Sequence, residues 1–186
     1  MKLPIHTLET AAEQARPIFD ATTQARGFVP NVYAVYGTLP DAMTGFAGLT
    51  GAFGASSLTP DEREVIQLAV SVANQCRYCV AGHTAFAAEA GLDEANVQAM
   101  RGGLDPDDDR LGALARFARK LTVDRGRNAT AEHAAFLAAG YAPEQALEVI
   151  IGVANKTLSN MTANLLNLPL DAAFAPYAWS PLEAAA

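Results

Sequence analysis

The stretch EREVIQLAVSVANQCRYCVAGHTAFAAEAG, residues 62–91, decides the fold. Its first half is an apolar helical run, and the pair Asn74-Gln75 breaks that run before a second one begins. We therefore predict a helix over residues 60–74 and a second helix over residues 76–90, closed by Gly91. Folded back on each other, these two helices would form a hairpin.

Capping residues and prolines mark the helix starts. Thr59 is predicted to cap the first of these helices, because a proline follows it and Glu62 lies three residues after it. Thr10 and Glu13 repeat this capping-box spacing, although Pro17 should interrupt the helix that they begin. Further helix signals are the predicted starts at Pro30, Pro40, Asp93, Pro106, Thr130 and Pro143, and a stop at Gly140.

Length and patterning indicate one all-α domain over residues 1–186. A chain of this length can bury a core, and much of its hydrophobic content is alanine, which favours helix. No segment shows sustained alternation rich in β-branched residues, so we predict about eight helices and no sheet. The tail, residues 169–186 with Trp179, is predicted to pack across a neighbour.

The charge distribution excludes several classes of partner. The net charge is −7 and the basic residues form no cluster, which argues against a nucleic acid or an anionic membrane as partner. Residues 42–60 are uncharged, but they hold four glycines and five Ser or Thr residues, so we reject a membrane span there. The N-terminus lacks the apolar run of a signal peptide, and we expect a cytoplasmic protein.

Two repeated patterns invite structural hypotheses. Glycines recur every three residues at 45, 48, 51 and 54, which predicts a smooth strip that a neighbouring helix approaches closely. The tripeptide Val-Ala-Asn at 72–74 recurs at 153–155, so residues 143–167 are a candidate degenerate repeat, a second helical hairpin without the cysteines. The alternative is two helices that share a small-residue contact. Asn155, Asn160 and Asn164 fall near one helical face, where they line either this repeat or a subunit contact.

The chemistry of the hairpin rests on two cysteines and a histidine. On a helix, Cys76, Cys79 and His83 fall within an arc of about 60°. Both cysteines lie in the first turn, where unpaired N–H groups and the helix dipole favour a thiolate. In an antiparallel hairpin, Glu64 draws level with residues past His83, so that a carboxylate, an imidazole and a thiol form a proton relay. Of the two nearby carboxylates, Glu62 is already explained as a capping residue, so we assign Glu64 to the relay.

Two other interpretations of the cysteines stay open at this point. They can be buried and inert, or they can bind zinc together with His83 and a fourth ligand from His6 or His133. A structural zinc site usually shows a second ligand pair at close spacing, and none appears. We therefore predict no metal and no cofactor.

The pattern Glu64-x11-Cys76-x2-Cys79-x3-His83 resembles the motif of the alkylhydroperoxidase D and carboxymuconolactone decarboxylase group, and residues 70–74 and 81–84 also look typical of it. The resemblance implies that Cys79 attacks a small hydroperoxide and becomes a sulfenic acid, which Cys76 resolves to a disulfide. It also implies that His83 and Glu64 relay protons. A lipoyl-carrying or thioredoxin-like protein would restore the dithiol, and the chain would form a homo-oligomer based on trimers.

One departure from the family pattern concerns the residue between the cysteines. Alkylhydroperoxidase D has a histidine where this chain has Tyr78, and a phenol is a poor base at neutral pH. We therefore expect Tyr78 to be a wall of the site. A decarboxylase or lactone-processing enzyme with dispensable thiols and a non-catalytic redox sensor remain alternatives to a peroxidase.

Overall fold

The computed structural model describes residues 2–181, and all regular structure in that range is helical, with no strand. It contains nine α-helices, close to the predicted number, and three short 3₁₀ helices. In chain order the elements are η1 (Glu13–Ala15), α1 (Arg16–Arg26), α2 (Asn31–Ala34), η2 (Val35–Thr38), α3 (Pro40–Gly54), α4 (Pro60–Ala73), α5 (Arg77–Ala90), α6 (Glu94–Arg101), α7 (Asp109–Asp124), α8 (Thr130–Ala138), α9 (Gln145–Leu166) and η3 (Ala172–Tyr177). The predicted all-α class is confirmed.

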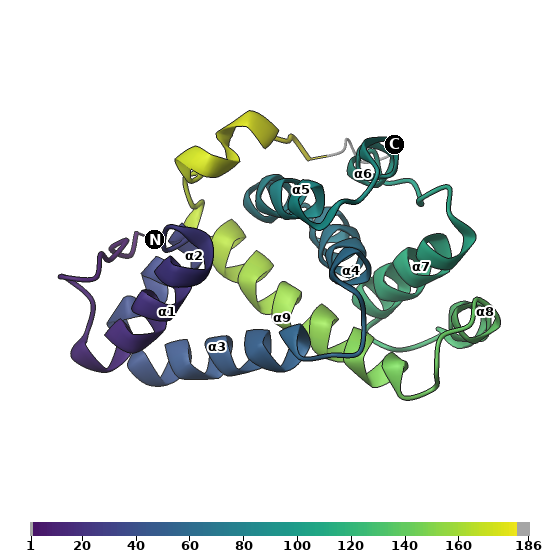
Figure 1. Cartoon of the computed structure of the whole chain (residues 1–186), viewed down its shortest axis with the longest axis horizontal. Helices are drawn as coiled ribbons and strands as arrows, with labels where there is room; N and C mark the ends of the chain where they lie inside the picture. The colour runs from purple at the N-terminus through teal and green to yellow at the C-terminus, as the bar shows by residue number, and fades with distance from the viewer. Residues whose placement is uncertain (1, 182–186) are drawn as a thin grey trace.

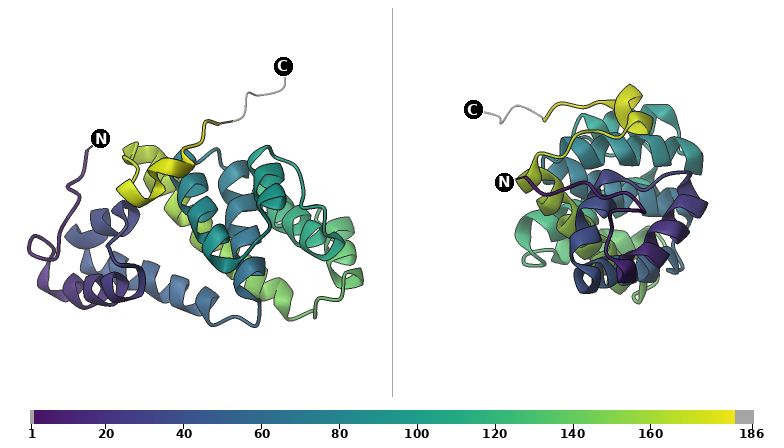
Figure 2. Two further views of the ribbon diagram at one scale, coloured as in Figure 1. Left: turned by 45° about the horizontal axis from the view of Figure 1, so that its top comes forward. Right: turned by 90° about the vertical axis from the view of Figure 1, so that its left-hand side faces the viewer.

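Helix α4 is the centre of the fold and packs against α5, α7 and α9 (Figure 1). Every residue from 65 to 72 is buried, because after its first turn this helix is apolar on almost every side. Helix α3 runs along α9, and η3 lies against α5, as the views in Figure 2 also show. Helices α4, α5 and α9 all pack against one another and so surround one common space.

The predicted hairpin is confirmed in detail. Thr59 and Glu62 form a complete capping box at the start of α4. Asn74 ends this helix, Gln75 adopts a left-handed conformation with φ 52°, and Cys76 is the N-cap of α5. Gly91 closes α5 in the left-handed conformation, which glycine adopts without steric cost.

The expected N-terminal helix begins differently. Thr10 caps no helix, since the N-cap of η1 is Ala12, which makes no side-chain capping bond. Pro17 lies in the first turn of α1 and does not interrupt it, because the N–H that proline lacks would have no partner there in any case. The predicted capping box of Thr10 and Glu13 is therefore wrong.

The glycines of α3 do not make the predicted close contact with a neighbouring helix. The four glycines of α3 are exposed, and no atom lies within 4 Å of a Cβ built on any of them. The helix packs through its other face, with Met43, Phe46 and Phe53 buried. Close approach occurs instead at Gly152 of α9, where a Cβ would lie 2.5 Å from the ring of Phe53.

The second hairpin predicted for residues 143–167 is not formed. Helix α9 runs unbroken through the second Val-Ala-Asn, because residue 156 continues the helix where Gln75 turns out of α4. The two copies of the tripeptide thus lie on helices that pack together, as in the alternative interpretation.

The C-terminal segment packs on its own chain. Phe174 of η3 is buried, and the Trp179 indole donates a hydrogen bond to the backbone carbonyl of Arg101, at 2.9 Å. Residues 182–186 of the predicted tail lie outside the described residues.

One apolar surface has no partner within the described chain. Five large side chains of α9 are between 38% and 68% exposed, at a spacing of three, eight, three and four residues: Leu147, Ile150, Leu158, Met161 and Leu165. This spacing places them on one side of the helix, and we refer to them as the α9 stripe. Between residues 2 and 181 no helix is long and apolar enough to cross a membrane.

Candidate active site

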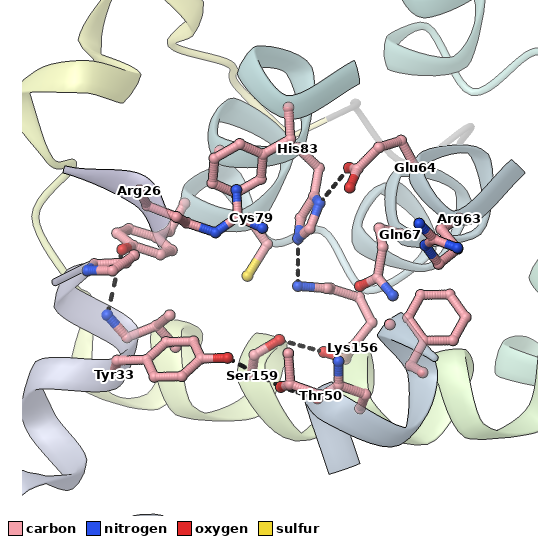
Figure 3. A pocket seen from close by; sticks show the side chains of 18 of the residues that line it. Arg26, Tyr33, Thr50, Arg63, Glu64, Gln67, Cys79, His83, Lys156 and Ser159 are labelled. Carbon is pink, nitrogen blue, oxygen red and sulfur yellow. Dashed lines mark hydrogen bonds and ion pairs between the residues drawn. The ribbon is translucent and has the colours of Figure 1, made fainter. Parts of the chain in front are cut away.

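The three central helices place a thiol, an imidazole, a carboxylate and an ammonium around one pocket (Figure 3). Cys79 and His83 come from α5, Glu64 from α4 and Lys156 from α9. The cavity volume is about 160 Å³. Two arginines, Arg26 and Arg63, also line it, and its aromatic lining residues are Tyr33, Phe46, Phe53, Tyr78, Phe86 and Phe174.

The imidazole of His83 lies between a carboxylate and an ammonium. Its Nδ1 is 2.6 Å from Oε2 of Glu64, and its Nε2 is 2.5 Å from Nζ of Lys156. Because an ammonium can only donate, Nε2 accepts from Lys156, and Nδ1 carries the proton that it donates to Glu64. The contact predicted between Glu64 and His83 is thus present, and the other ring nitrogen of His83 bonds to Lys156, which the predicted relay did not include.

Burial and the neighbouring ammonium keep His83 neutral. Burial has the largest effect on its pKa, Lys156 adds to it, and together they outweigh Glu64 and lower the pKa to about 4. Of this hydrogen-bonded pair, the lysine is therefore the cation and the histidine is neutral.

The environment distinguishes the two free thiols, which are 0% and 3% exposed for Cys76 and Cys79. Burial alone would raise the pKa of Cys79, but the hydrogen bond from Cys76, the charge of Lys156 and bonds from Asn160 and Ser159 lower it to about 6. The pKa of Cys76 is raised, first because its thiol donates to Cys79 and second because it is buried. At neutral pH Cys79 is thus the thiolate and Cys76 the thiol.

Sequence reasoning singled out asparagines of α9 but missed Lys156. Lys156 is 7% exposed and is the only charged residue between positions 149 and 166, so a single charge in an apolar helix was the available signal. Asn160 is 1% exposed; its amide donates to Ser71 at 3.3 Å and accepts from Asn74 at 2.9 Å. It therefore ties α9 to the turn that positions the cysteines.

The other asparagines also bind within the chain. Thr50 donates to the side chain of Asn155, and Asn164 donates to the backbone carbonyl of Asn74. These asparagines therefore bond to neighbouring elements of the same chain and do not line a second hairpin, which is not formed.

The remaining candidates near the hairpin have other partners. Tyr78 lines the pocket with its ring, and its hydroxyl donates to Asp171 at 2.5 Å and accepts from the amide of Val32. Its pKa is raised by burial and by Asp171, so the phenol stays protonated. Arg77 donates to Asn167, away from the thiols. Glu62 completes its cap and forms an ion pair with Arg110 at 3.1 Å.

The histidines proposed as a fourth zinc ligand lie elsewhere. His6 is hydrogen-bonded to Thr10 and Thr38, and the ring of His133 packs against Phe117. Among residues 2–181, no cluster of three or more His, Cys, Asp or Glu side chains could hold a metal ion.

Comparisons with known proteins indicate a family resemblance and the fold. The family model of the carboxymuconolactone decarboxylase family matches residues 38–120. A structure described as an alkylhydroperoxidase AhpD core, an uncharacterized peroxidase-related protein from Ralstonia eutropha JMP134, is 28% identical, with a TM-score of 0.84 over 93% of each chain. A comparison with curated proteins found no match.

Two more distant structures share the fold. An uncharacterized peroxidase-related protein from Silicibacter sp. TM1040 is 21% identical, with a TM-score of 0.80 over 94% of this chain and 92% of that one. The debrominase Bmp8, in complex with 2,3,4-tribromopyrrole, is 21% identical, with a TM-score of 0.76 over 89% of this chain and 90% of that one. Residues 38–120 thus resemble the carboxymuconolactone decarboxylase family, whose model they match, and the fold of the chain is that of its AhpD-like structural neighbours.

Proposed function

We propose that the protein is a thiol-dependent peroxidase that reduces organic hydroperoxides through a Cys76–Cys79 dithiol and disulfide cycle. The observation that carries the proposal is the thiolate of Cys79, whose pKa is lowered to about 6 in a pocket that also holds Lys156. A thiolate is the form that attacks a peroxide, and an adjacent ammonium can supply the proton that the leaving group needs.

In the first half of the cycle, the Cys79 thiolate attacks the terminal oxygen of the hydroperoxide. An S–O bond forms and the O–O bond breaks, so that Cys79 becomes a sulfenic acid and an alkoxide leaves. Lys156 gives a proton to the alkoxide, which departs as an alcohol. His83 and Glu64 act as positioning residues, because they hold the ammonium through the chain of hydrogen bonds described above.

In the second half, Cys76 attacks the sulfenic sulfur. A disulfide forms, and the hydroxyl leaves as water with the proton of Cys76. A dithiol donor then reduces the disulfide to the Cys76 thiol and the Cys79 thiolate, and the proton released restores Lys156. The sum is one hydroperoxide and one dithiol converted into an alcohol, water and a disulfide. A lipoyl-carrying or thioredoxin-like protein in the cytoplasm is the proposed donor.

The test follows the thiols after a hydroperoxide is added to the reduced protein. The wild type should lose both thiols and two hydrogen masses, whereas Cys76→Ser should hold a sulfenic acid on Cys79 that dimedone traps. Cys79→Ser should react no faster than a free thiol. If both thiols of the wild type stay unreacted, the proposal is refuted. A decarboxylase or lactone-processing activity is then the favoured alternative. If a disulfide forms but no dithiol sustains turnover, the site is a redox sensor.

We also propose that the protein is a homo-oligomer based on trimers, in which the α9 stripe lies at the contact between copies. Large apolar side chains aligned on one face of a helix mark association surfaces. The stripe contains no charge, so a second apolar surface can cover it without leaving a buried charge unpaired.

A further inference from the structure

The side-chain amide of Gln67 is an exception among the buried polar groups around the pocket. Gln67 is 3% exposed, and neither its Nε2 nor its Oε1 has a hydrogen-bond partner among residues 2–181. Glu64 and Ser71, one turn before and after it on α4, are both hydrogen-bonded. A buried amide whose donor and acceptor both lack hydrogen-bond partners destabilises the protein, unless a molecule bound in the pocket supplies those partners.

The amide of Gln67 belongs to the same pocket as the reacting groups. Gln67 lines the same pocket as Cys79, His83 and Lys156, and Figure 3 shows its amide beside the stem of Lys156, whose nitrogen extends toward Cys79. The unpaired amide thus belongs to the wall of the pocket in which a bound molecule would meet the thiolate and the ammonium.

We propose that Gln67 binds the peroxide group itself and orients it for attack by Cys79, an inference that rests on the proposed function. An amide offers one donor and one acceptor side by side, and a hydroperoxide offers the complementary acceptor and donor. Its Nε2 donates to an oxygen of the peroxide, and its Oε1 accepts the terminal O–H. The terminal oxygen is thereby held for the thiolate, and the inner oxygen lies toward Lys156.

The size and lining of the pocket define the rest of the substrate. An apolar cavity of about 150 Å³ in another protein holds one benzene molecule, and this pocket has a volume of about 160 Å³, with six Phe and Tyr rings among its lining residues. The preferred substrate is therefore a hydroperoxide with a compact apolar body of about one ring, such as cumene hydroperoxide. Hydrogen peroxide lacks that apolar body, and a long-chain lipid hydroperoxide would have to extend out of the pocket.

The first experiment compares Gln67→Leu with wild type in single-turnover reduction of cumene hydroperoxide. Leucine keeps the approximate volume and makes no hydrogen bond. We expect the rate to fall about 10- to 100-fold, while the rate and pH profile of Cys79 alkylation by iodoacetamide stay unchanged. Gln98→Leu, a substitution at an exposed position of α6, is the matched control and should leave both rates unchanged. Equal peroxide rates for Gln67→Leu and wild type would overturn the inference.

A binding measurement separates this inference from the proposed function. In a Cys76→Ser/Cys79→Ser protein, which cannot react, cumene hydroperoxide should bind, and the added Gln67→Leu substitution should weaken that binding about 10-fold or more. If the wild type consumes no peroxide, the proposed function fails, yet binding that depends on Gln67 would still support the inference. Absence of binding, or binding that does not depend on Gln67, would overturn it.

Discussion

Replacing Lys156 with methionine should raise the pKa of Cys79 and slow its reaction with peroxide near neutral pH. Methionine keeps the length of the side chain and suits a position that is only 7% exposed. The substitution removes the cation whose charge lowers the pKa of Cys79, and it leaves the hydrogen bonds from Cys76, Asn160 and Ser159 in place.

The magnitude follows from the pKa of about 6 in the wild type. A neighbouring opposite charge shifts a pKa by about 1 to 3 units, and with three hydrogen bonds retained we expect a rise of about 1 to 2 units. At about pH 6.5 the thiolate fraction would then fall from about three quarters to between about 3% and 25%, so that reactions of the thiolate slow about 3- to 25-fold.

Two assays separate the two roles of the lysine. Alkylation by iodoacetamide requires only the thiolate, so the variant should match the wild type once the pH is above both pKa values. Reduction of cumene hydroperoxide also requires a proton for the leaving alkoxide, so the variant should stay slower there. The thiolate titration is followed by ultraviolet absorbance, and the peroxide step by quenched-flow mass spectrometry.

Lys120→Met is the control, because this lysine lies on α7 and forms an ion pair with Asp124 at 2.9 Å. It should leave the titration of Cys79 unchanged. A Lys156→Met protein whose Cys79 titrates at the wild-type midpoint would refute the electrostatic role. A variant that regains full peroxide activity at high pH would refute the role as proton donor.

Two further predictions concern acid stability and assembly. Because folding lowers the pKa of His83 from 6.5 to about 4, the unfolded chain takes up a proton first, and stability falls as the pH drops from 6.5 toward 4, by up to about 3 kcal/mol. His83→Gln should remove this part of the acid sensitivity in urea denaturation at neutral and acid pH, and an unchanged pH dependence would contradict the assignment. Leu158→Glu with Met161→Glu on the α9 stripe should yield a smaller species in light scattering, whereas Val123→Glu, on an isolated exposed residue of α7, should not. An unchanged mass for the stripe variant would exclude α9 from the contact.

The hairpin could be predicted because its signals are local in sequence. Thr59 and Glu62 satisfy each other within one turn, and Asn74-Gln75 breaks the helix through the backbone conformation of two adjacent residues. Spacing on a helix then places Cys79 and His83 on one face. The contact with Glu64 follows once the two helices are antiparallel.

The contribution of α9 could not be predicted in the same way. Lys156 meets His83 across 73 positions of sequence, and no local pattern encodes which helix covers the hairpin. The glycines of α3 illustrate the same difficulty, because a periodic strip predicts a smooth face but not whether another helix covers it. Here the large apolar side chains of α3 determine which face is buried, and Gly152 on the partner helix provides the close approach.

The presence of Lys156 also changes the direction of proton transfer from the one predicted from the sequence. In that scheme Glu64 charges His83, and His83 takes the proton of a thiol. In the structure the thiol is already ionised at neutral pH, so no base is needed to create the nucleophile, and the pKa of the imidazole is too low for it to be the acid. What the reaction still needs is a proton for the leaving oxygen, and the ammonium of Lys156 is the one cation that the imidazole holds in place. The Glu64–His83 pair is thus better suited to positioning a proton donor than to activating a nucleophile, and its loss should affect the peroxide step more than alkylation.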